Sequence, residues 1–146
     1  MRFVRARMRL SQHPGGNAFH VNQCHTLVDD EAWVFQHPSG TIVCQPLRVE
    51  EASLAAAIEA SRFQPSTSIS TFESLITGEC GICCGIFMNE TLVGCAAANI
   101  TPALDGFASE AFFDNVSILA EHSGCGLGLM LTAYLIKLCS GLPHRC

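Results

Sequence analysis

Apolar residues follow two different spacings along the chain, and these spacings predict a domain that mixes strands with helices. Short apolar runs lie on either side of residues 37–40, which is typical of two strands joined by a turn. Residues 49–63 combine alanines with apolar side chains four apart and two acids in the first turn, so they predict a helix. This helix ends before Pro65, and residues 71–77 predict a shorter helix that ends at Gly78.

The second half of the chain predicts three strands and a last helix. Two apolar runs, 81–88 and 91–100, are separated only by an Asn-Glu pair, which indicates a hairpin. Residues 112–119 predict a third strand, and the apolar block 126–139 predicts a helix. The resulting order is β-α-α-β-β-β-α, preceded by one or more extra strands. The predicted fold class is therefore α/β, with an α+β-like mixed sheet.

The distribution of charge divides the chain into a basic tail and one domain. Arginines are frequent in the first nine residues, whereas no acid appears before Asp29. We assign residues 1–16 to a basic N-terminal tail and residues 17–146 to a single domain, because this length supports one hydrophobic core. An Arg-rich, acid-free start is also typical of an organellar transit peptide, and this alternative stays open.

Charge and hydropathy exclude two classes of partner. The formal net charge is −5, and all 13 acids lie outside the Arg-rich start, which argues against nucleic acid as a partner. No apolar run reaches the ~20 residues that span a membrane. We therefore predict a cytoplasmic protein with neither a nucleic acid nor a membrane partner.

Nine cysteines are many for a chain of 146 residues. Cys80, Cys83 and Cys84 have the spacing of half a zinc motif, but the chain has no second pair with this spacing, so we predict no metal site. A buried cysteine behaves as a small hydrophobic residue, which is the interpretation that we prefer. An odd number of cysteines without a secretory signal favours reduced thiols.

The stretch 121–139 holds the strongest chemical signal. Gly124, Gly126 and Gly128 lie between a predicted strand and the last predicted helix. The start of a helix has unpaired amides and a positive dipole end that bind anions, and glycine lets a ligand approach the backbone. The spacing fits neither the P-loop nor a good dinucleotide fingerprint. A tight strand-to-helix turn without a ligand is the alternative interpretation.

In this context the chain resembles the GCN5-related N-acetyltransferase (GNAT) superfamily. The signature of that superfamily, Q/R-x-x-G-x-G/A, follows its fourth core strand, and residues 123–128 are similar to it, with Gly126 and Gly128 at the two small positions. The predicted hairpin over 81–100 is similar to the second and third strands of the superfamily. The strand and helix before the hairpin are similar to its first strand and helix. The resemblance covers residues 41–139.

The resemblance implies an acyl-CoA-dependent N-acyltransferase. Such an enzyme transfers an acetyl group from acetyl-CoA, its cosubstrate, to a small amine or a protein amine. The backbone amides of the signature would bind the pyrophosphate. The end of the preceding strand would bind the pantetheine arm and polarise the thioester carbonyl, with Ile118 and Ala120 at the matching positions. The cofactor-binding residues implied in this way are Ile118, Leu119, Ala120, Ser123, Gly124, Cys125, Gly126, Leu127 and Gly128.

Asp114 is the candidate catalytic base. Strict strand alternation places it on the same face as Phe112, Val116 and Ile118. A carboxylate on this strand resembles the way in which some members of the superfamily place their base, and it could take a proton from the amine. An exposed acid at the end of a strand is the alternative. A cysteine nucleophile at Cys125 is conceivable, but no His and acid partners are recognisable from the spacing.

The sequence departs from the superfamily at two points. Ser123 stands at the Q/R position and Glu121 adds a negative charge close by, so we expect weak acetyl-CoA binding. The superfamily also has further strands and a helix after the last predicted helix of this chain. A truncated product, a degenerate relative, a swapped homodimer that completes the sheet, or a strand supplied by residues 17–36 would each account for this difference. Whether the chain is an enzyme therefore stays open, and a non-catalytic module for CoA sensing or protein–protein interaction is the competing function.

Overall fold

The computed structural model describes residues 6–9, 25–27, 32–78, 80–101 and 110–140, and the side chains of residues 6–9, 25–27, 114 and 115 lie outside this description. The elements in chain order are β1 (Ala6–Arg9), β2 (His25–Leu27), β3 (Trp33–His37), β4 (Gly40–Pro46), the 3-10 helix η1 (Val49–Glu51), α1 (Ala52–Arg62), α2 (Ile69–Thr77), β5 (Gly81–Met88), β6 (Thr91–Thr101), β7 (Glu110–Ile118), the 3-10 helix η2 (Ala120–His122) and α3 (Leu127–Ser140).

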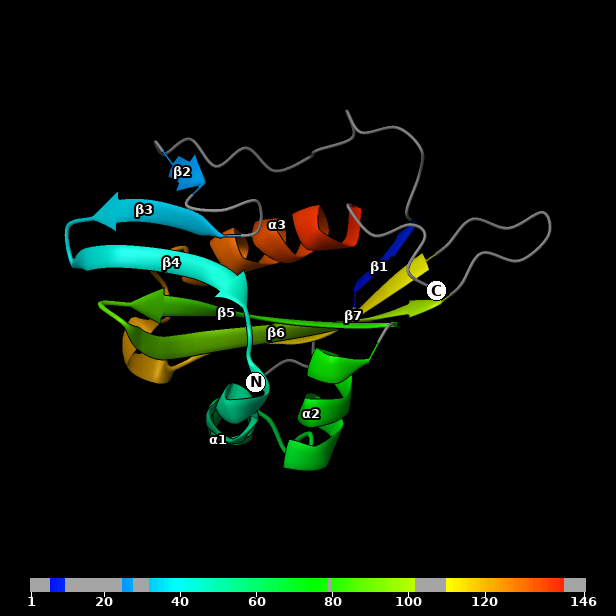
Figure 1. The fold of residues 1–146 in the computed structure, drawn as a ribbon. Coiled ribbons are helices and arrows are strands. Elements are labelled where there is room, and N and C mark those ends of the chain that lie inside the picture. Colours follow the sequence, from blue (N-terminus) through cyan, green and yellow to red (C-terminus); the bar gives the residue numbers. More distant parts are fainter. Residues whose placement is uncertain (1–5, 10–24, 28–31, 79, 102–109, 141–146) are drawn as a thin grey trace.

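Seven strands form one antiparallel sheet in the order β1-β7-β6-β5-β4-β3-β2. Helices α1 and α2 cover one face of this sheet and α3 covers the other (Figure 1). Each face has its own hydrophobic core, one beneath α3 and one beneath α1 and α2. The mixed α/β fold class and the predicted order of elements, including extra strands near the N-terminus, are confirmed.

Strands β5 and β6 form the centre of the sheet. Every residue of β5 is buried, and β6 is buried from Leu92 to Ala98. Because helices cover both faces here, side chains of both orientations are apolar, which explains the continuous apolar runs. The turn between the two strands is confirmed at Asn89 and Glu90, whose φ angles of 49° and 70° suit a two-residue hairpin turn.

Gly94 sets the distance between β6 and β7. A Cβ atom at this position would lie 2.4 Å from Ile118 Cδ1 and 2.9 Å from the Ser117 carbonyl oxygen. Any larger residue would therefore push β7 away from β6. Gly94 is the register partner of Ile118, the last residue of β7. The glycine thus positions the end of the strand that leads into the glycine-rich turn.

Helix α3 is apolar on most of its surface, and a strand near the N-terminus covers part of it. Tyr134 is fully buried, and strand β3 supplies part of its cover. The Trp33 ring meets the Tyr134 ring edge-on with 5.2 Å between centroids. Lys137 Nζ lies 5.4 Å from the centroid of the Trp33 ring. At the start of the helix Leu129 stays 59% exposed, so the cover is incomplete there.

Helix α1 packs on the sheet mainly through small side chains. Ala55 and Ile58 are buried, whereas Leu54, which shares helical spacing with Ile58, is 54% exposed. Helix α2 begins after Ser68, whose Oγ accepts a hydrogen bond from the Thr71 amide at 3.2 Å. This side-chain cap satisfies one of the amides that the first turn leaves unpaired.

The N-terminal strands lie on both edges of the sheet. Strands β2 and β3 extend the edge beyond β4, so the described residues between 17 and 36 supply no strand beside 112–119. Residues 6–9 take that place instead, as β1, which pairs antiparallel with β7. The register joins Ala6 to Phe113 at one end. The sheet therefore begins inside the segment for which a basic tail was predicted.

The cysteines fill the core, as expected for most of them. Cys44, Cys83, Cys84, Cys95 and Cys139 are buried and free. Burial raises the pKa of the Cys44, Cys83 and Cys139 thiols to about 12, so these groups stay neutral at physiological pH. Cys80 differs from the expected reduced state, because it is disulfide-bonded.

Candidate functional site

The glycine-rich turn connects η2 with α3 at one end of the sheet. Gly124 and Gly126 have φ angles of +82° and +86°, which L-residues with a side chain rarely adopt. A Cβ atom added at either glycine would meet no atom within 4 Å. The backbone conformation alone therefore requires glycine at these two positions, and the space beside them is open to a ligand.

The first turn of α3 presents unpaired backbone amides next to this open space. Its first hydrogen bond runs from the Met130 amide to the Gly126 carbonyl at 3.1 Å. The amides of Leu127, Gly128 and Leu129 precede this bond and have no acceptor within the helix. Because residue 126 is glycine, it offers no side chain to cap them. The positive end of the helix dipole adds to the attraction for an anion.

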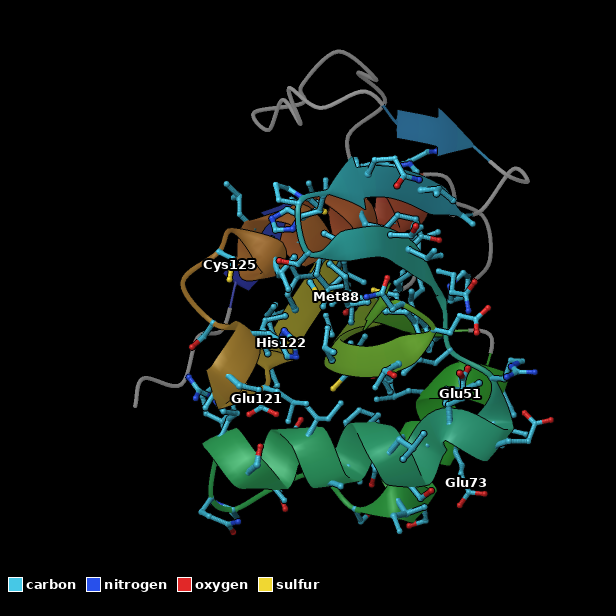
Figure 2. The ribbon with its side chains drawn as sticks, turned by 90° about the vertical axis from the view of Figure 1, so that its left-hand side faces the viewer. Glu51, Glu73, Met88, Glu121, His122 and Cys125 are labelled. Carbon is cyan, nitrogen blue, oxygen red and sulfur yellow. The ribbon has the colours of Figure 1, made fainter. Side chains whose placement is uncertain are left out.

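The side chains around the turn add little positive charge. Ser123 Oγ donates a hydrogen bond to the Ala120 carbonyl at 2.8 Å, and Cys125 Sγ donates one to the His122 carbonyl at 3.2 Å. Both side chains therefore bond back onto η2. Figure 2 shows Glu121, His122 and Cys125 together at this end of the molecule. The sequence from 119 to 136 contains no Lys or Arg, so an anion here would rely on backbone amides.

Strand β7 carries a bulge just before the site. Its register with β6 shifts between Ala96 and Ala98, which leaves an extra residue in β7 between Phe113 and Val116. Val116 and Ile118 pack into the core beneath α3, as Phe113 does, whereas Phe112 is 43% exposed. The expectation that Phe112 shares a face with Val116 and Ile118 is wrong, because the bulge interrupts the alternation.

The outer edge of β7 pairs with β1 in the part of the chain that the structure describes. The described residues of β1 pair with residues 110–113. Within the part of the chain that the structure describes, no strand pairs with this edge between Asp114 and Ile118. The Leu119 amide donates to the Val93 carbonyl on β6 at 2.9 Å. By strand alternation the N–H and C=O groups of Val116 and Ile118 face the opposite way, toward the open edge.

The structure thus brings most of the predicted cofactor residues to one end of the sheet. They differ in whether their backbone groups are free to bind a ligand. Ile118 ends β7 with its amide on the open edge. Leu119 is less suited to donating a hydrogen bond to a cofactor, because its amide already donates to β6. The Ala120 carbonyl accepts from the Ser123 amide at 3.2 Å and from its hydroxyl, so it is occupied as well. The side chain of Asp114 lies outside the described residues.

Two features of the site were not anticipated from the sequence. Val116 presents backbone groups to the same edge as Ile118, because the two residues are two apart in the strand. Ser117 is 1% exposed, and its buried hydroxyl has no hydrogen-bond partner among the residues that the structure describes. Asp114 and Asn115 are adjacent residues of types that strands disfavour, and this was the one sequence signal for the bulge.

A separate pocket of about 620 Å³ opens on the face of the sheet that carries α1 and α2. Its lining residues are Thr41, Val43, Gln45, Arg48, Glu51, Phe87, Asn89 and Glu90. None of them comes from β7, η2 or α3, so the pocket is distinct from the glycine-rich turn. At one end Glu51 Oε1 accepts hydrogen bonds from the Arg48 amide at 2.8 Å and from Arg48 Nε at 3.4 Å. Figure 2 shows Glu51 well away from Cys125 and Glu121.

The described residues contain no group of three or more His, Cys, Asp or Glu side chains that could hold a metal ion. None of the described helices is long and apolar enough to cross a membrane.

No protein-family model and no curated protein matches the chain, but solved structures do. A ribosomal-protein-alanine N-acetyltransferase from Brucella melitensis is 18% identical with a TM-score of 0.55, over 69% of this chain and 73% of that one. An aminoglycoside acetyltransferase from an uncultured soil sample is 16% identical with a TM-score of 0.54, over 68% and 72%. Arabidopsis thaliana Naa50, solved with the bisubstrate analogue CoA-Ac-MVNAL, is 18% identical with a TM-score of 0.55, over 72% and 68%. These similarities show that the chain has the GNAT fold.

Proposed function

We propose that the chain is an acyl-CoA-dependent N-acetyltransferase that transfers an acetyl group from acetyl-CoA to an amine. One observation carries this proposal: the end of β7, which has no partner strand on its outer edge among the described residues, runs directly into a turn with open space and unpaired amides. A long ligand that has amides at one end and phosphates at the other matches both parts of this site. The shared fold with solved N-acetyltransferases supports the same assignment.

The turn and the start of α3 would hold the pyrophosphate. The two positive-φ glycines leave room beside the backbone, and the amides of Leu127, Gly128 and Leu129 point out of the helix start. Charge-assisted hydrogen bonds from such amides to a phosphate oxygen are stronger than neutral ones. The exposed carboxylate of Glu121 opposes this attraction. Ser123 and Cys125 would contribute their backbone, because their side chains bond to η2.

The open edge of β7 would hold the amide-bearing arm of the cofactor. An extended chain that pairs with a strand edge uses the same N–H and C=O groups as another strand would. Val116 and Ile118 present these groups. Ile118 lies nearest the turn and would bind an amide of the arm, while the Val116 amide, farther from the pyrophosphate, is the donor that would polarise the thioester carbonyl. This mode of binding requires no particular side chain. The selectivity of the edge for the cofactor arm comes from the positions of the backbone groups.

The chemical step needs an unprotonated amine beside the thioester. The amine nitrogen attacks the carbonyl carbon, the bond from carbon to sulfur breaks, and CoA leaves as its thiolate, which becomes the thiol by taking up the proton that the amine has lost. The proton lost by the amine requires an acceptor, for which Asp114 is the proposed base, directly or through water. Its backbone lies in β7 beside the bulge, on the strand that would hold the cofactor. A small amine and a protein amine are both compatible with this arrangement.

A non-catalytic module that senses CoA is the second candidate function. The observation that favours it is the charge of the turn, which has Ser123 at the position where the superfamily signature has Gln or Arg. Losing one charged hydrogen bond to phosphate costs about 1.5–3 kcal/mol, which lowers affinity roughly tenfold to a hundredfold. Such a protein would bind acetyl-CoA weakly and turn over no amine.

A titration with acetyl-CoA and an acetyl-transfer assay separate the two candidates. Calorimetry of the full chain should show one acetyl-CoA per protein, and CoA release over a panel of small amines and N-terminal peptides should show turnover with at least one acceptor. Binding without turnover on any acceptor would favour the module. The absence of binding at millimolar acetyl-CoA would refute both candidates.

A further inference from the structure

The pocket of about 620 Å³ on β4 lies apart from the proposed cofactor site. Helices α1 and α2 pack over β5, β6 and β7, whereas the same face of β4 opens into this pocket. Thr41, Val43 and Gln45 are alternate residues of β4, so all three side chains line it. A cavity of this volume is in the range of pockets that hold small molecules.

The floor of the pocket is apolar. Val43 and Phe87 are register partners on β4 and β5, and both line the pocket. Phe87 belongs to the core beneath α1 and α2, and Val43 packs against that core, so the packing fixes both side chains in place. A ligand that covered this pair would remove further apolar surface from water, which favours binding.

One end of the pocket is formed by an ion pair whose two charges offset each other. Glu51 Oε1 accepts hydrogen bonds from the Arg48 amide at 2.8 Å and from Arg48 Nε at 3.4 Å. The Arg48 side chain is 73% exposed, whereas that of Glu51 is only 9% exposed. This end therefore carries no net charge, and it attracts an ion of either sign only weakly.

The opposite end carries a negative charge that nothing offsets. The Asn89 side chain is occupied there, because it accepts from the Thr41 amide at 3.0 Å and donates to the Ser39 carbonyl at 3.1 Å. Glu90 follows in the hairpin turn, is exposed, and forms no ion pair with any residue that the structure describes. One arginine and two glutamates are among the described lining residues, so their net charge is −1, located at Glu90.

We propose that this pocket binds a small organic monocation, an amine with an apolar body. Its ammonium group lies against Glu90, and its carbon chain lies on Val43 and Phe87 and extends toward Gln45. The floor from Thr41 to Gln45 is about 13 Å long, at ~3.3 Å per residue, which leaves room for such a chain. The charge of the pocket disfavours anions, acetyl-CoA included.

This amine is not the acceptor of the acetyl group, and the inference does not rest on the proposed function. Strands β6 and β5 lie between β7 and β4 in the sheet. At the usual spacing of neighbouring strands, β4 is about 14 Å from the strand that would hold the thioester. The pocket is therefore a second ligand site, on a different part of the sheet from the proposed chemistry.

An NMR titration of the isotope-labelled chain with hexylamine, without acetyl-CoA, tests this site. We expect saturable shifts of the backbone amides of Val43, Phe87 and Glu90. Hexan-1-ol has the same carbon chain without the charge, and it should bind about threefold to fivefold more weakly, which is the usual contribution of a partly exposed ion pair. Hexanoate, which has the opposite charge, should bind more weakly than hexan-1-ol.

Two variants locate the charge that the amine contacts. Glu90→Gln removes the charge and keeps the size of the side chain, so its affinity for hexylamine should fall to that of wild type for hexan-1-ol. Glu73→Gln is the matched control and should bind hexylamine as wild type does, because Glu73 is an exposed acid of α2 that does not line the pocket.

Four results would overturn the inference. They are equal affinities for the amine and the alcohol, tighter binding of hexanoate than of hexylamine, an unchanged hexylamine affinity in Glu90→Gln, and the absence of saturable shifts at Val43 and Phe87. Each of them would leave the proposed acetyl transfer standing, because that function is tested separately by the titration with acetyl-CoA.

Discussion

Replacing Gly126 is the sharpest perturbation of the glycine-rich turn. Its φ angle is +86°, and a residue with a Cβ atom in the left-handed region costs roughly 1–2 kcal/mol. The added Cβ of alanine would meet no atom within 4 Å, so no steric clash adds to this cost. We therefore expect Gly126→Ala to lower the free energy of unfolding by about 1–2 kcal/mol and to leave the fold intact.

Gly128 provides the matched control two residues later. It lies within α3 without a positive φ, and an added Cβ would be 3.7 Å from Ile118 Cγ1, an ordinary contact. Alanine favours a helix over glycine by up to about 1 kcal/mol. Gly128→Ala should therefore raise the free energy of unfolding, or leave it unchanged, while the same mutation at Gly126 lowers it. Urea denaturation followed by circular dichroism measures both.

The same pair of variants tests whether the turn has a ligand. If the open space beside Gly126 belongs to a pyrophosphate, Gly126→Ala should also weaken acetyl-CoA binding, whereas Gly128→Ala should keep it. Equal stability of wild type and Gly126→Ala would refute the positive φ. Unchanged acetyl-CoA affinity in a destabilised Gly126→Ala would show that the glycines serve the turn alone.

Three further outcomes follow from the site and the core. Ser123→Arg should raise acetyl-CoA affinity roughly tenfold to a hundredfold by restoring a charged phosphate contact, and calorimetry showing no gain would place the phosphates elsewhere. Asp114→Asn should lower kcat in the acetyl-transfer assay with little change in acetyl-CoA affinity, and an unchanged kcat would exclude Asp114 as the base. The pKa of Cys44 and Cys139 is raised to about 12, so the unfolded chain releases these protons first. The contribution of these thiols to the free energy of unfolding should therefore be fully present below the ordinary thiol pKa near 9 and should decline as pH rises toward 12. Urea midpoints that stay constant from about pH 8.5 to 10.5 would contradict this.

The sequence was most informative where local signals and burial agree. The hairpin at Asn89 and Glu90 follows from two apolar runs with a two-residue gap, and its position is confirmed. The positions of the glycine turn and of α3 were predicted closely. A positive φ favours glycine, and the start of the helix follows directly after these glycines. The exposed Leu54 shows the limit of this reasoning, since spacing alone does not reveal where a neighbouring helix or sheet ends.

Long-range pairing was the part that the sequence could not supply. Residues 6–9 have no period that distinguishes an edge strand from a basic tail, and their place beside β7 depends on a partner about a hundred residues away. The bulge near Asp114 likewise could not be predicted from local sequence, because it depends on the register between β6 and β7. Strict alternation therefore placed Phe112 on the wrong face. The cover that Trp33 gives to Tyr134 likewise joins residues distant in sequence.

The central claim is that acetyl-CoA binds along the open edge of β7 and the turn that follows it. An NMR titration of the isotope-labelled chain with acetyl-CoA tests this claim residue by residue through the backbone amide resonances. The account predicts saturable shifts at Val116, Ile118, Gly126 and Gly128, with little change at Val43 in the separate pocket. Shifts confined to the pocket around Val43, or no saturable shift anywhere, would contradict the account.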